Sequence, residues 1–288
     1  MPENDLQPFL KWAGGKRQLL QEIIMRIPEH IDSFYEPMCG AAAITFGILN
    51  RENPPKKIVL NDLNSALMEA FSVVRDQSDL LCDRLRILED AYLGLDESGR
   101  SDRYYEERDM EYSASVDRVA RFIFLNRTCF NGLYRVNKKG RFNVPHGKYK
   151  NPRILNESLL RSVSKALGNV EIYSGDYRSI LKDCHSGDFV YFDPPFEPIS
   201  STSSFTGYTA EGFGRVQQLD LRAECDRLDD MGVNFLVSNS GQDYIRGIYE
   251  GAFRGYTIEE VSAKRSINAI GSGRTPVTEL LISNPVTE

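Results

Sequence analysis

The sequence predicts an α/β protein built on a doubly wound, mostly parallel sheet. Short runs rich in Val, Ile, Phe and Tyr alternate with stretches whose apolar residues recur at helical spacing, a pattern typical of parallel sheets covered by helices. The alternation stops between about residues 75 and 168, where two helical stretches precede a basic, glycine-containing segment. The chain has 288 residues, enough for one large domain or two.

The elements follow from these runs in chain order. Strands are expected at 33–39, 57–61, 170–174, 189–192, 233–238 and 279–283. Helices are expected between them at 41–50, 63–74 and 217–230, and within the interruption at 79–93 and 117–126. The connection at 94–116 gives no clear prediction. We therefore predict an inserted, mainly helical lobe at 76–156 within a domain formed by 1–75 and 157–288.

Composition excludes several classes of protein. No run approaches the ~20 apolar residues of a membrane span, and the acidic start Met1–Asp5 does not resemble a secretory signal. The five cysteines form no CxxC pair and the three histidines have no metal-ligand spacing. We expect a soluble, cytoplasmic protein with free thiols, no membrane partner and no metal.

The charge is unevenly distributed. The net charge is -6, yet residues 118–156 hold ten of the 35 basic residues and none of the 41 acidic ones. A solvated basic face is the ordinary explanation of such a block. Aromatic residues and glycines are interleaved with the charges, for example Phe130, Gly132 and Tyr134, and this mixture favours contact with nucleic acid.

Three motifs are placed where a small ligand binds in parallel sheets, at the carboxyl ends of the strands. The first strand runs into YEPMCGAAA, whose Gly40 allows close approach to the backbone. Asp62 closes the next strand, where a carboxylate suits ribose hydroxyls, although a helix cap explains it equally well. Near the start, KWAGGKR lacks the P-loop pattern, and its Lys16 is expected to hold a ligand carboxylate.

The fourth motif is FVYFDPPF, an apolar strand that ends in a carboxylate, two prolines and an aromatic ring. Asp193 and the carbonyl of Pro194 are hydrogen-bond acceptors, and the prolines contribute no N–H donors. Phe196 offers a flat stacking surface. Two acceptors beside a ring suit the exocyclic amino group of a base turned out of a duplex, while an isolated DPP is more often a structural turn.

With these motifs in this order, the chain resembles the Dam-type (D12 class, alpha-type) adenine-specific DNA methyltransferases, particularly the GATC-methylating enzymes of bacterial restriction–modification systems. The matching blocks span nearly the whole chain: PFLKWAGGKRQLL, YEPMCG, NDLN, FNGLYRVNKKGRFNVPHGKYKNP, GDFVYFDPPF and FTGYT. The resemblance implies a seven-stranded Rossmann-like methyltransferase sheet with an inserted DNA target-recognition domain at 76–156. It also implies methyl transfer from S-adenosylmethionine to the adenine N6 by base flipping, with GATC as the expected site.

The resemblance assigns roles to individual residues. The cofactor would contact Lys16 through its carboxylate, Asp62 through its ribose and Asp176 through its adenine. Further cofactor-binding positions would be Trp12, Glu36, Gly40 and Asp193. In catalysis, Asp193 and the Pro194 carbonyl would accept hydrogen bonds from the target amino group while Phe196 stacks on the flipped base. No metal is implied.

Double-stranded DNA is the implied partner, with a cognate restriction endonuclease acting separately left open. Arg135 and Lys11 would read guanines, Leu133 and Pro145 would meet a thymine methyl, and Phe130 would wedge into the base stack. The remaining implied DNA contacts are Asn131, Lys148 and Tyr149. Most other basic residues of 118–156 would grip phosphates.

Three features depart from the family pattern. Phe196 replaces a common Tyr, and because stacking needs only the ring, activity should survive. Ala41 and Ala42 stand where the family commonly has a second glycine, and Ala42 is expected to crowd the cofactor and weaken its binding. His146 occupies a usually aromatic position. The alternatives are a DNA-binding relative without activity, a methyltransferase of cytosine or RNA, and recognition of a related GAT-containing site.

Overall fold

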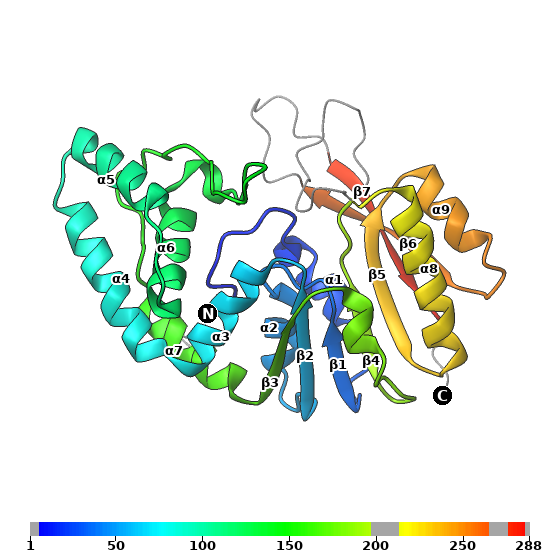
Figure 1. Ribbon diagram of the computed structural model, residues 1–288. Coiled ribbons are helices and arrows are strands. Elements are labelled where there is room, and N and C mark those ends of the chain that lie inside the picture. Colours follow the sequence, from blue (N-terminus) through cyan, green and yellow to red (C-terminus); the bar gives the residue numbers. More distant parts are fainter. Residues whose placement is uncertain (1–5, 197–212, 265–275, 286–288) are drawn as a thin grey trace.

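The computed structural model describes residues 6–196, 213–264 and 276–285. The FTGYT block at 205–209 lies outside the described residues. The molecule has a central sheet with a helical lobe on one side of it (Figure 1).

The described strands form one seven-stranded sheet in the order β3-β2-β1-β4-β5-β7-β6. The first five positions of that order pair in parallel, whereas β7 pairs antiparallel with both β5 and β6. The predicted doubly wound, mostly parallel sheet is confirmed. The strands are β1 (Ser33–Glu36), β2 (Lys57–Asp62), β3 (Val170–Ser174), β4 (Phe189–Phe192), β5 (Asn234–Ser240), β6 (Thr257–Lys264) and β7 (Pro276–Ser283).

Helices cover both faces of the sheet because alternate strand residues point to opposite sides. Phe34 and Tyr191 belong to a core shared with α1, α2 and α3, while Tyr35 and Val190 belong to a core shared with α8 and α9. The helices are α1 (Leu20–Ile24), α2 (Ala43–Leu49), α3 (Ser65–Asp76), α4 (Ser78–Leu93), α5 (Glu97–Asp109), α6 (Ser115–Thr128), α7 (Glu157–Ala166), α8 (Arg215–Asp230) and α9 (Asp243–Glu250).

Two predicted boundaries are wrong for physical reasons. The first strand ends at Glu36 rather than Cys39, because Pro37 has no N–H to continue the ladder. The following helix starts at Ala43 rather than Ala41, since Gly40 and Ala42 adopt φ values of 49° and 56°, which are not helical. The prediction also omitted β6, α5, α7 and α9.

The lobe consists of α4, α5 and α6, followed by a short 3-10 turn, η2 (Phe130–Gly132), and an irregular segment that leads to α7. α6 packs on α3 and α4, and α7 packs on the same two helices. One apolar core therefore runs from the sheet into the lobe without a break. Residue 76 is the last residue of α3, and α7 begins at Glu157.

Candidate active site

The site lies where the strand order reverses, between β1 and β4. The chain leaves β1 toward β2 on one side and leaves β4 toward β5 on the other. Loops at the carboxyl ends of these two neighbouring strands therefore diverge, which opens a crevice for ligands in folds of this kind. The loop after β1 contains Gly40, and the loop after β4 contains Asp193 and Phe196.

Glu36 anchors the loop after β1. Its carboxylate oxygen Oε2 accepts a hydrogen bond from the backbone N–H of Thr45 at 3.0 Å and another from the Thr45 hydroxyl. Thr45 lies in the first turn of α2, where Ala42 offers no side-chain cap, so Glu36 satisfies a backbone donor of that turn. Glu36 is buried, and burial raises the pKa of its carboxyl to about 8. Glu36 thus links the end of β1 to the first turn of α2.

Gly40 and Asp62 connect the loops after β1 and β2. The backbone N–H of Gly40 donates to Asp62 Oδ2 at 3.0 Å, and the N–H of Asn64 donates to Asp62 Oδ1 at 2.9 Å. A Cβ at Gly40 would lie 3.0 Å from Cδ1 of the Trp12 indole, so the turn requires glycine both for its positive φ and for this close approach. Burial raises the pKa of Asp62. Trp12, Gly40 and Asp62 are thus brought together as the sequence predicts.

Asn61 extends this connection to β3. Its side-chain amide donates to the carbonyls of Pro37 and Gly175, both at 2.9 Å, while its buried Oδ1 has no hydrogen-bond partner among the described residues. Asp176 follows Gly175, but its carboxylate is paired with Arg178 at 2.9 Å and is half exposed. This ion pair lowers the pKa of Asp176.

Ala42 does not face the crevice. Its side chain is fully buried in the apolar core between the sheet and its helices. The expectation that its methyl group crowds a ligand in the crevice is therefore not supported by the geometry.

Lys16, Asp193 and Phe196 meet at the other side of the crevice. The Lys16 ammonium lies 3.0 Å from Asp193 Oδ1 and 4.4 Å from the centre of the Phe196 ring. It also lies 3.1 Å from Oε2 of Glu279 on β7, a residue that sequence reasoning assigned only to a strand. Lys16 comes from η1 (Lys16–Gln18) and is 6% exposed, so its charge is compensated almost entirely by these two carboxylates.

For both Lys16 and Asp193, burial and the opposite charge beside the group shift its pKa in opposite directions. Burial tends to lower the pKa of Lys16, but Asp193 and Glu279 raise it overall. Burial raises the pKa of Asp193 to about 6, although Lys16 acts in the opposite direction. Asp193 is therefore a carboxylate at neutral pH, with its ionisation poised near the physiological range.

Two buried amides support the loop after β4. Gln218 of α8 donates to the carbonyl of Pro195 at 3.2 Å, and Asn239 of β5 donates to Gln218 Oε1 at 2.9 Å. Both amide residues are fully buried. They hold the second proline of DPPF in place, and no sequence pattern pointed to them because their partners lie more than twenty residues away.

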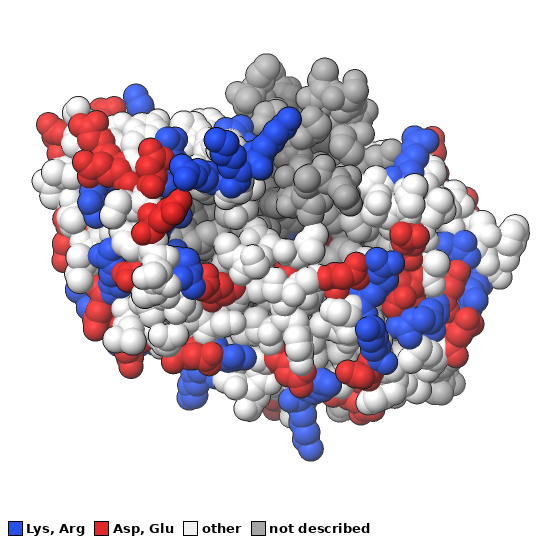
Figure 2. Space-filling view, viewed as in Figure 1, with Lys and Arg blue, Asp and Glu red and all other residues white. Residues whose placement is uncertain are grey.

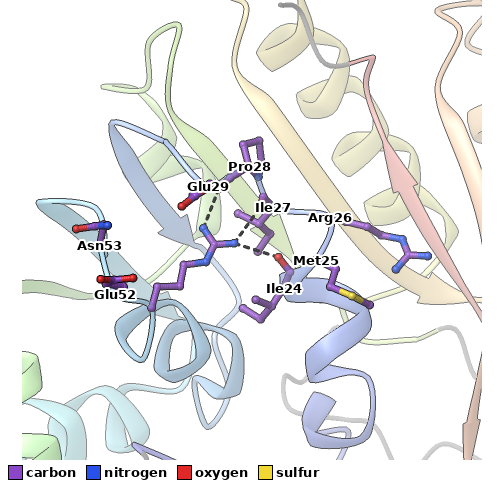
Figure 3. A pocket seen from close by; sticks show the side chains of 9 residues that line it. Ile24, Met25, Arg26, Ile27, Pro28, Glu29, Glu52 and Asn53 are labelled. Carbon is purple, nitrogen blue, oxygen red and sulfur yellow. Dashed lines mark hydrogen bonds between the residues drawn. The ribbon is translucent and has the colours of Figure 1, made fainter.

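A separate surface cavity of about 620 Å³ lies at the opposite edge of the sheet. It is lined by residues 24–29 and 51–53, which precede β1 and β2 rather than follow them (Figure 3). The Arg51 guanidinium there donates to the carbonyls of Ile24, Ile27 and Pro28, so its side chain satisfies the end of α1. This cavity contains none of the predicted functional residues.

The lobe brings the predicted DNA-contacting residues to one region. Asn126 of α6 accepts from the Lys11 N–H at 2.8 Å and donates to the carbonyls of Lys11 and Gly132. The Lys11 ammonium lies 4.6 Å from the centre of the Tyr149 ring. Burial lowers the pKa of Lys11. The segment that carries Lys11 is therefore fixed against the turn at 130–133.

That turn presents two exposed side chains. Phe130 is 49% exposed, and its N–H donates to the carbonyl of Pro145 at 2.8 Å. Asn131 has a φ of 55°, a conformation that Asn tolerates better than most residues. Phe130, Asn131 and Pro145 thus lie side by side, and Leu133 follows on the same turn.

Arg135 begins a small hairpin. Its guanidinium donates to the side-chain and backbone oxygens of Asn143, at 2.7 and 3.1 Å, and the side chain is exposed. The bridge between Val136 and Phe142 and the turn closed by Asn137 complete the hairpin. Lys148 is also exposed and lies 3.9 Å from Glu97.

The basic block is only partly available for ligands. Arg118 pairs with Glu69, Arg121 donates to the carbonyls of Glu107 and Arg108, and Arg127 donates to the carbonyl of Phe9. Arg118 and Arg127 therefore connect the lobe to the rest of the chain, and Arg121 connects two parts of the lobe. On the face shown in Figure 2, basic side chains gather along the inner edge of the lobe, while acidic ones lie at its outer end.

Sequence comparisons agree with this arrangement. The sequence model of the D12 class N6 adenine-specific DNA methyltransferases matches residues 12–267. The type II methyltransferase M.MjaIII of Methanocaldococcus jannaschii is 43% identical over 97% of this chain and 99% of its own length. The type II methyltransferase M1.LlaDCHI of Lactococcus lactis subsp. cremoris is 39% identical over 97% and 96%. The DNA adenine methylase of Escherichia coli K12 is 33% identical over 95% and 93%.

The chain belongs to the D12 class of N6 adenine-specific DNA methyltransferases. It is an adenine-specific DNA methyltransferase, and the resemblance found in the sequence motifs is confirmed. In the described part of the chain, no cluster of three His, Cys, Asp or Glu side chains could hold a metal ion. Among the same residues, no helix is long and apolar enough to cross a membrane.

Proposed function

We propose that this enzyme transfers a methyl group from S-adenosylmethionine to the N6 amino group of adenine in GATC sites of duplex DNA, by base flipping and direct transfer. The observation that carries the proposal is the convergence of Asp193, Phe196 and Lys16 at the strand switch point. An acceptor, a ring face and a cation lie together beside a loop of small residues. Residues 76–156 would then form the target-recognition domain.

The residues present fit S-adenosylmethionine. Gly40 gives the backbone a close approach, Asp62 keeps carboxylate oxygens at the end of β2, and Asn61 Oδ1 is a buried acceptor without a partner among the described residues. Lys16 provides a cation for a carboxylate group. When bound, this cofactor supplies a methyl group on a positively charged sulfur. Trp12, Glu36 and Asp176 complete the proposed binding set, with Glu36 acting from beneath the loop.

Asp193 is the principal catalytic residue of the proposal. As a carboxylate it accepts a hydrogen bond from the target amino group, and the Pro194 carbonyl accepts a second, which orients the nitrogen lone pair for in-line attack. The Pro195 carbonyl is already engaged by Gln218, so it fixes the loop. Phe196 stacks on the flipped base, because stacking depends on the ring and needs no hydroxyl.

The lobe supplies recognition in this proposal. Arg135 is exposed and held by Asn143, as a side chain that reads guanine in the major groove requires. Lys11 reads a second guanine, Leu133 and Pro145 meet a thymine methyl, and Phe130 fills the gap left by the adenine. Asn131, Lys148 and Tyr149 complete the interface. Since two relatives are named type II methyltransferases, a cognate restriction endonuclease acting separately is part of the proposal.

Asp193→Ala tests the chemical assignment. The variant should lose adenine methylation while retaining DNA binding, because Asp193 lies outside the lobe that grips DNA. Methylation is measured with labelled S-adenosylmethionine, and base flipping by the fluorescence of 2-aminopurine at the target position. Unchanged methylation by the variant, or no fluorescence change when the wild-type protein binds, would contradict the mechanism.

A further inference from the structure

Glu279 is a largely buried carboxylate that has no role in the proposed methyl transfer. It lies on β7, which is separated from β4 by β5. Its Oε2 lies 3.1 Å from the Lys16 ammonium and accepts a hydrogen bond from the Ser238 hydroxyl at 3.3 Å. The side chain is 12% exposed. A carboxylate in this setting requires a partner to offset its desolvation, and Lys16 provides it.

Lys16 occupies the contacts that the target adenine needs. Its ammonium lies against Asp193 Oδ1 and over the face of Phe196, the same acceptor and the same ring that the proposed function assigns to the base. Entry of the base therefore requires Lys16 to give up both contacts. This cation is 6% exposed, and after the loss of Asp193 it would keep Glu279 beside the cofactor carboxylate that the proposed function assigns to it.

We propose that Glu279 is a positioning residue that retains the Lys16 ammonium when Asp193 turns to the target amino group. Glu279 is the second carboxylate paired with Lys16, so the base pocket opens while the ammonium stays held by a carboxylate of the protein. This inference rests on the proposed function of Asp193 and deepens it. Glu279 does not touch the reacting atoms and acts only through Lys16.

The charges around Asp193 support this role. Lys16 lowers the pKa of Asp193, whereas the negative charge of Glu279 raises it. Among the residues that the structure describes, Glu36 on β1 and Tyr191 on β4 also interact electrostatically with Asp193. Removing the Glu279 charge while leaving Lys16 in place should lower the pKa of Asp193, because Lys16 then serves a single carboxylate.

Glu279→Gln and Glu279→Asp test the proposal, with Glu259→Gln as a control. Glu259 is an exposed carboxylate on the neighbouring strand β6 and pairs with Arg26. Single-turnover methylation of duplex DNA is measured across pH, together with KM for DNA. For Glu279→Gln we expect a roughly tenfold loss of rate at neutral pH, little change in KM, and a fall in rate at acid pH that begins at a lower pH than in the wild-type enzyme. Glu279→Asp should keep the acid limb and lose only about threefold in rate.

A second readout needs neither cofactor nor DNA. The Asp193 carboxyl is titrated by carbon NMR in the free protein, where Glu279→Gln should lower its midpoint and Glu259→Gln should not. An unchanged midpoint, or a wild-type rate in Glu279→Gln, overturns the proposal. If Glu279→Gln does not fold, a wild-type rate in Glu279→Asp overturns it instead. Failure of the wild-type protein to flip or methylate adenine would refute the proposed function separately.

Discussion

At the scale of single residues, the charges around Asp193 control the ionisation of its carboxyl group, and the proposed mechanism requires the ionised form. The carboxylate is partnered by Lys16 and lies near a second carboxylate, Glu279. Burial and the Glu279 charge favour its neutral form, while Lys16 favours its ionised form. The balance leaves the pKa of Asp193 at about 6, so small changes at Lys16 alter the protonation of Asp193 within the range of ordinary assays.

The methylation rate should fall as pH drops through about 6. Above this pKa Asp193 is a carboxylate that accepts the amino hydrogen bond, and below it the acid neither accepts as strongly nor holds Lys16. Lys16→Met removes the group that lowers the pKa of Asp193. In this variant the acid limb of the pH–rate profile, where the methylation rate falls, should therefore move to higher pH. A single-turnover pH profile measures both.

Lys57→Met serves as the control, because the Lys57 ammonium makes a surface pair with Glu171, 3.9 Å away, on strands β2 and β3. Its pH profile should match that of the wild-type enzyme. An acid limb in Lys16→Met that stays at the wild-type position would contradict the assignment of the limb to Asp193.

Arg135→Ala should relax the sequence preference of methylation. A bidentate contact with guanine is worth roughly 1–3 kcal/mol of discrimination, which corresponds to about five- to a hundredfold between the cognate duplex and one changed at that guanine. Competition between the two duplexes measures the ratio. Arg141→Ala, on the same hairpin but paired with Glu111, should keep the preference, and an unaltered preference in Arg135→Ala would refute its role.

The buried His146 ring packs among aromatic side chains. It contacts Tyr104 at 5.1 Å between ring centroids, and its Nε2 lies 2.6 Å from the Tyr92 hydroxyl. Burial lowers the pKa of His146, which favours the neutral ring. The neighbouring Pro145 keeps its place through the hydrogen bond from Phe130.

At the scale of elements, α6 links the amino-terminal segment to the recognition turn through Asn126. Asn126→Ala leaves the backbone groups of Lys11 and the Gly132 carbonyl without this partner. We expect a loss of about 2–3 kcal/mol in the free energy of unfolding, because buried donors and acceptors are costly when unpaired. Urea denaturation measures it. Asn151→Ala, at an exposed position, should change stability little, and equal stabilities of the two variants would contradict this role.

The sequence predicted the central elements well because their residues carry strong local signals. The strands at 57–62, 170–174 and 189–192 are short runs that contain Val, Ile, Phe or Tyr, and their observed bounds match the expected ones to within a residue. By contrast, α5 is so polar that it buries only Tyr104 and Glu107, which gives no clear periodicity. The short helices α7 and α9 offered only two or three turns, and β6 lies at the sheet edge with Glu259 and Glu260 among its residues.

Some residues of the candidate site could likewise be predicted from the sequence, and others could not. Asp62 and Asp193 could be predicted because Asp62 ends β2 and Asp193 directly follows β4, and parallel strands bring their carboxyl ends to one edge. Glu279, Asn126 and Gln218 could not, since each acts through a partner distant in sequence: Lys16, Lys11 and Pro195. Glu36 was predicted at the site, but its bond to Thr45 depends on where α2 begins.

At the scale of the whole molecule, an acidic protein must bind an acidic polymer. The net charge is -6, and three of the arginines in the basic block are engaged within the fold. Affinity for DNA should therefore depend on the exposed cations of residues 118–156 that make no such contact, such as Lys138 and Lys139.

Replacing Lys138 and Lys139 with Ala should weaken binding equally for cognate and non-cognate duplexes, because phosphate contacts carry no sequence information. The dependence of affinity on salt should also become shallower, by about one ion for each phosphate that is no longer bound. Binding titrations at several salt concentrations measure both effects. The same double change at Lys56 and Lys57, which adjoin the start of β2 at the opposite edge of the sheet, should leave binding unchanged. A loss confined to the cognate duplex would contradict the assignment to phosphates.

The most direct test of the central claim is transfer of labelled methyl from S-adenosylmethionine to a duplex with one GATC site, beside a duplex of equal composition without it. The account predicts label on the GATC duplex alone, recovered as N6-methyladenine. Label on both duplexes would keep the chemistry and contradict the proposed site. No label on either, from protein that binds both cofactor and DNA, would contradict the claim of S-adenosylmethionine-dependent transfer.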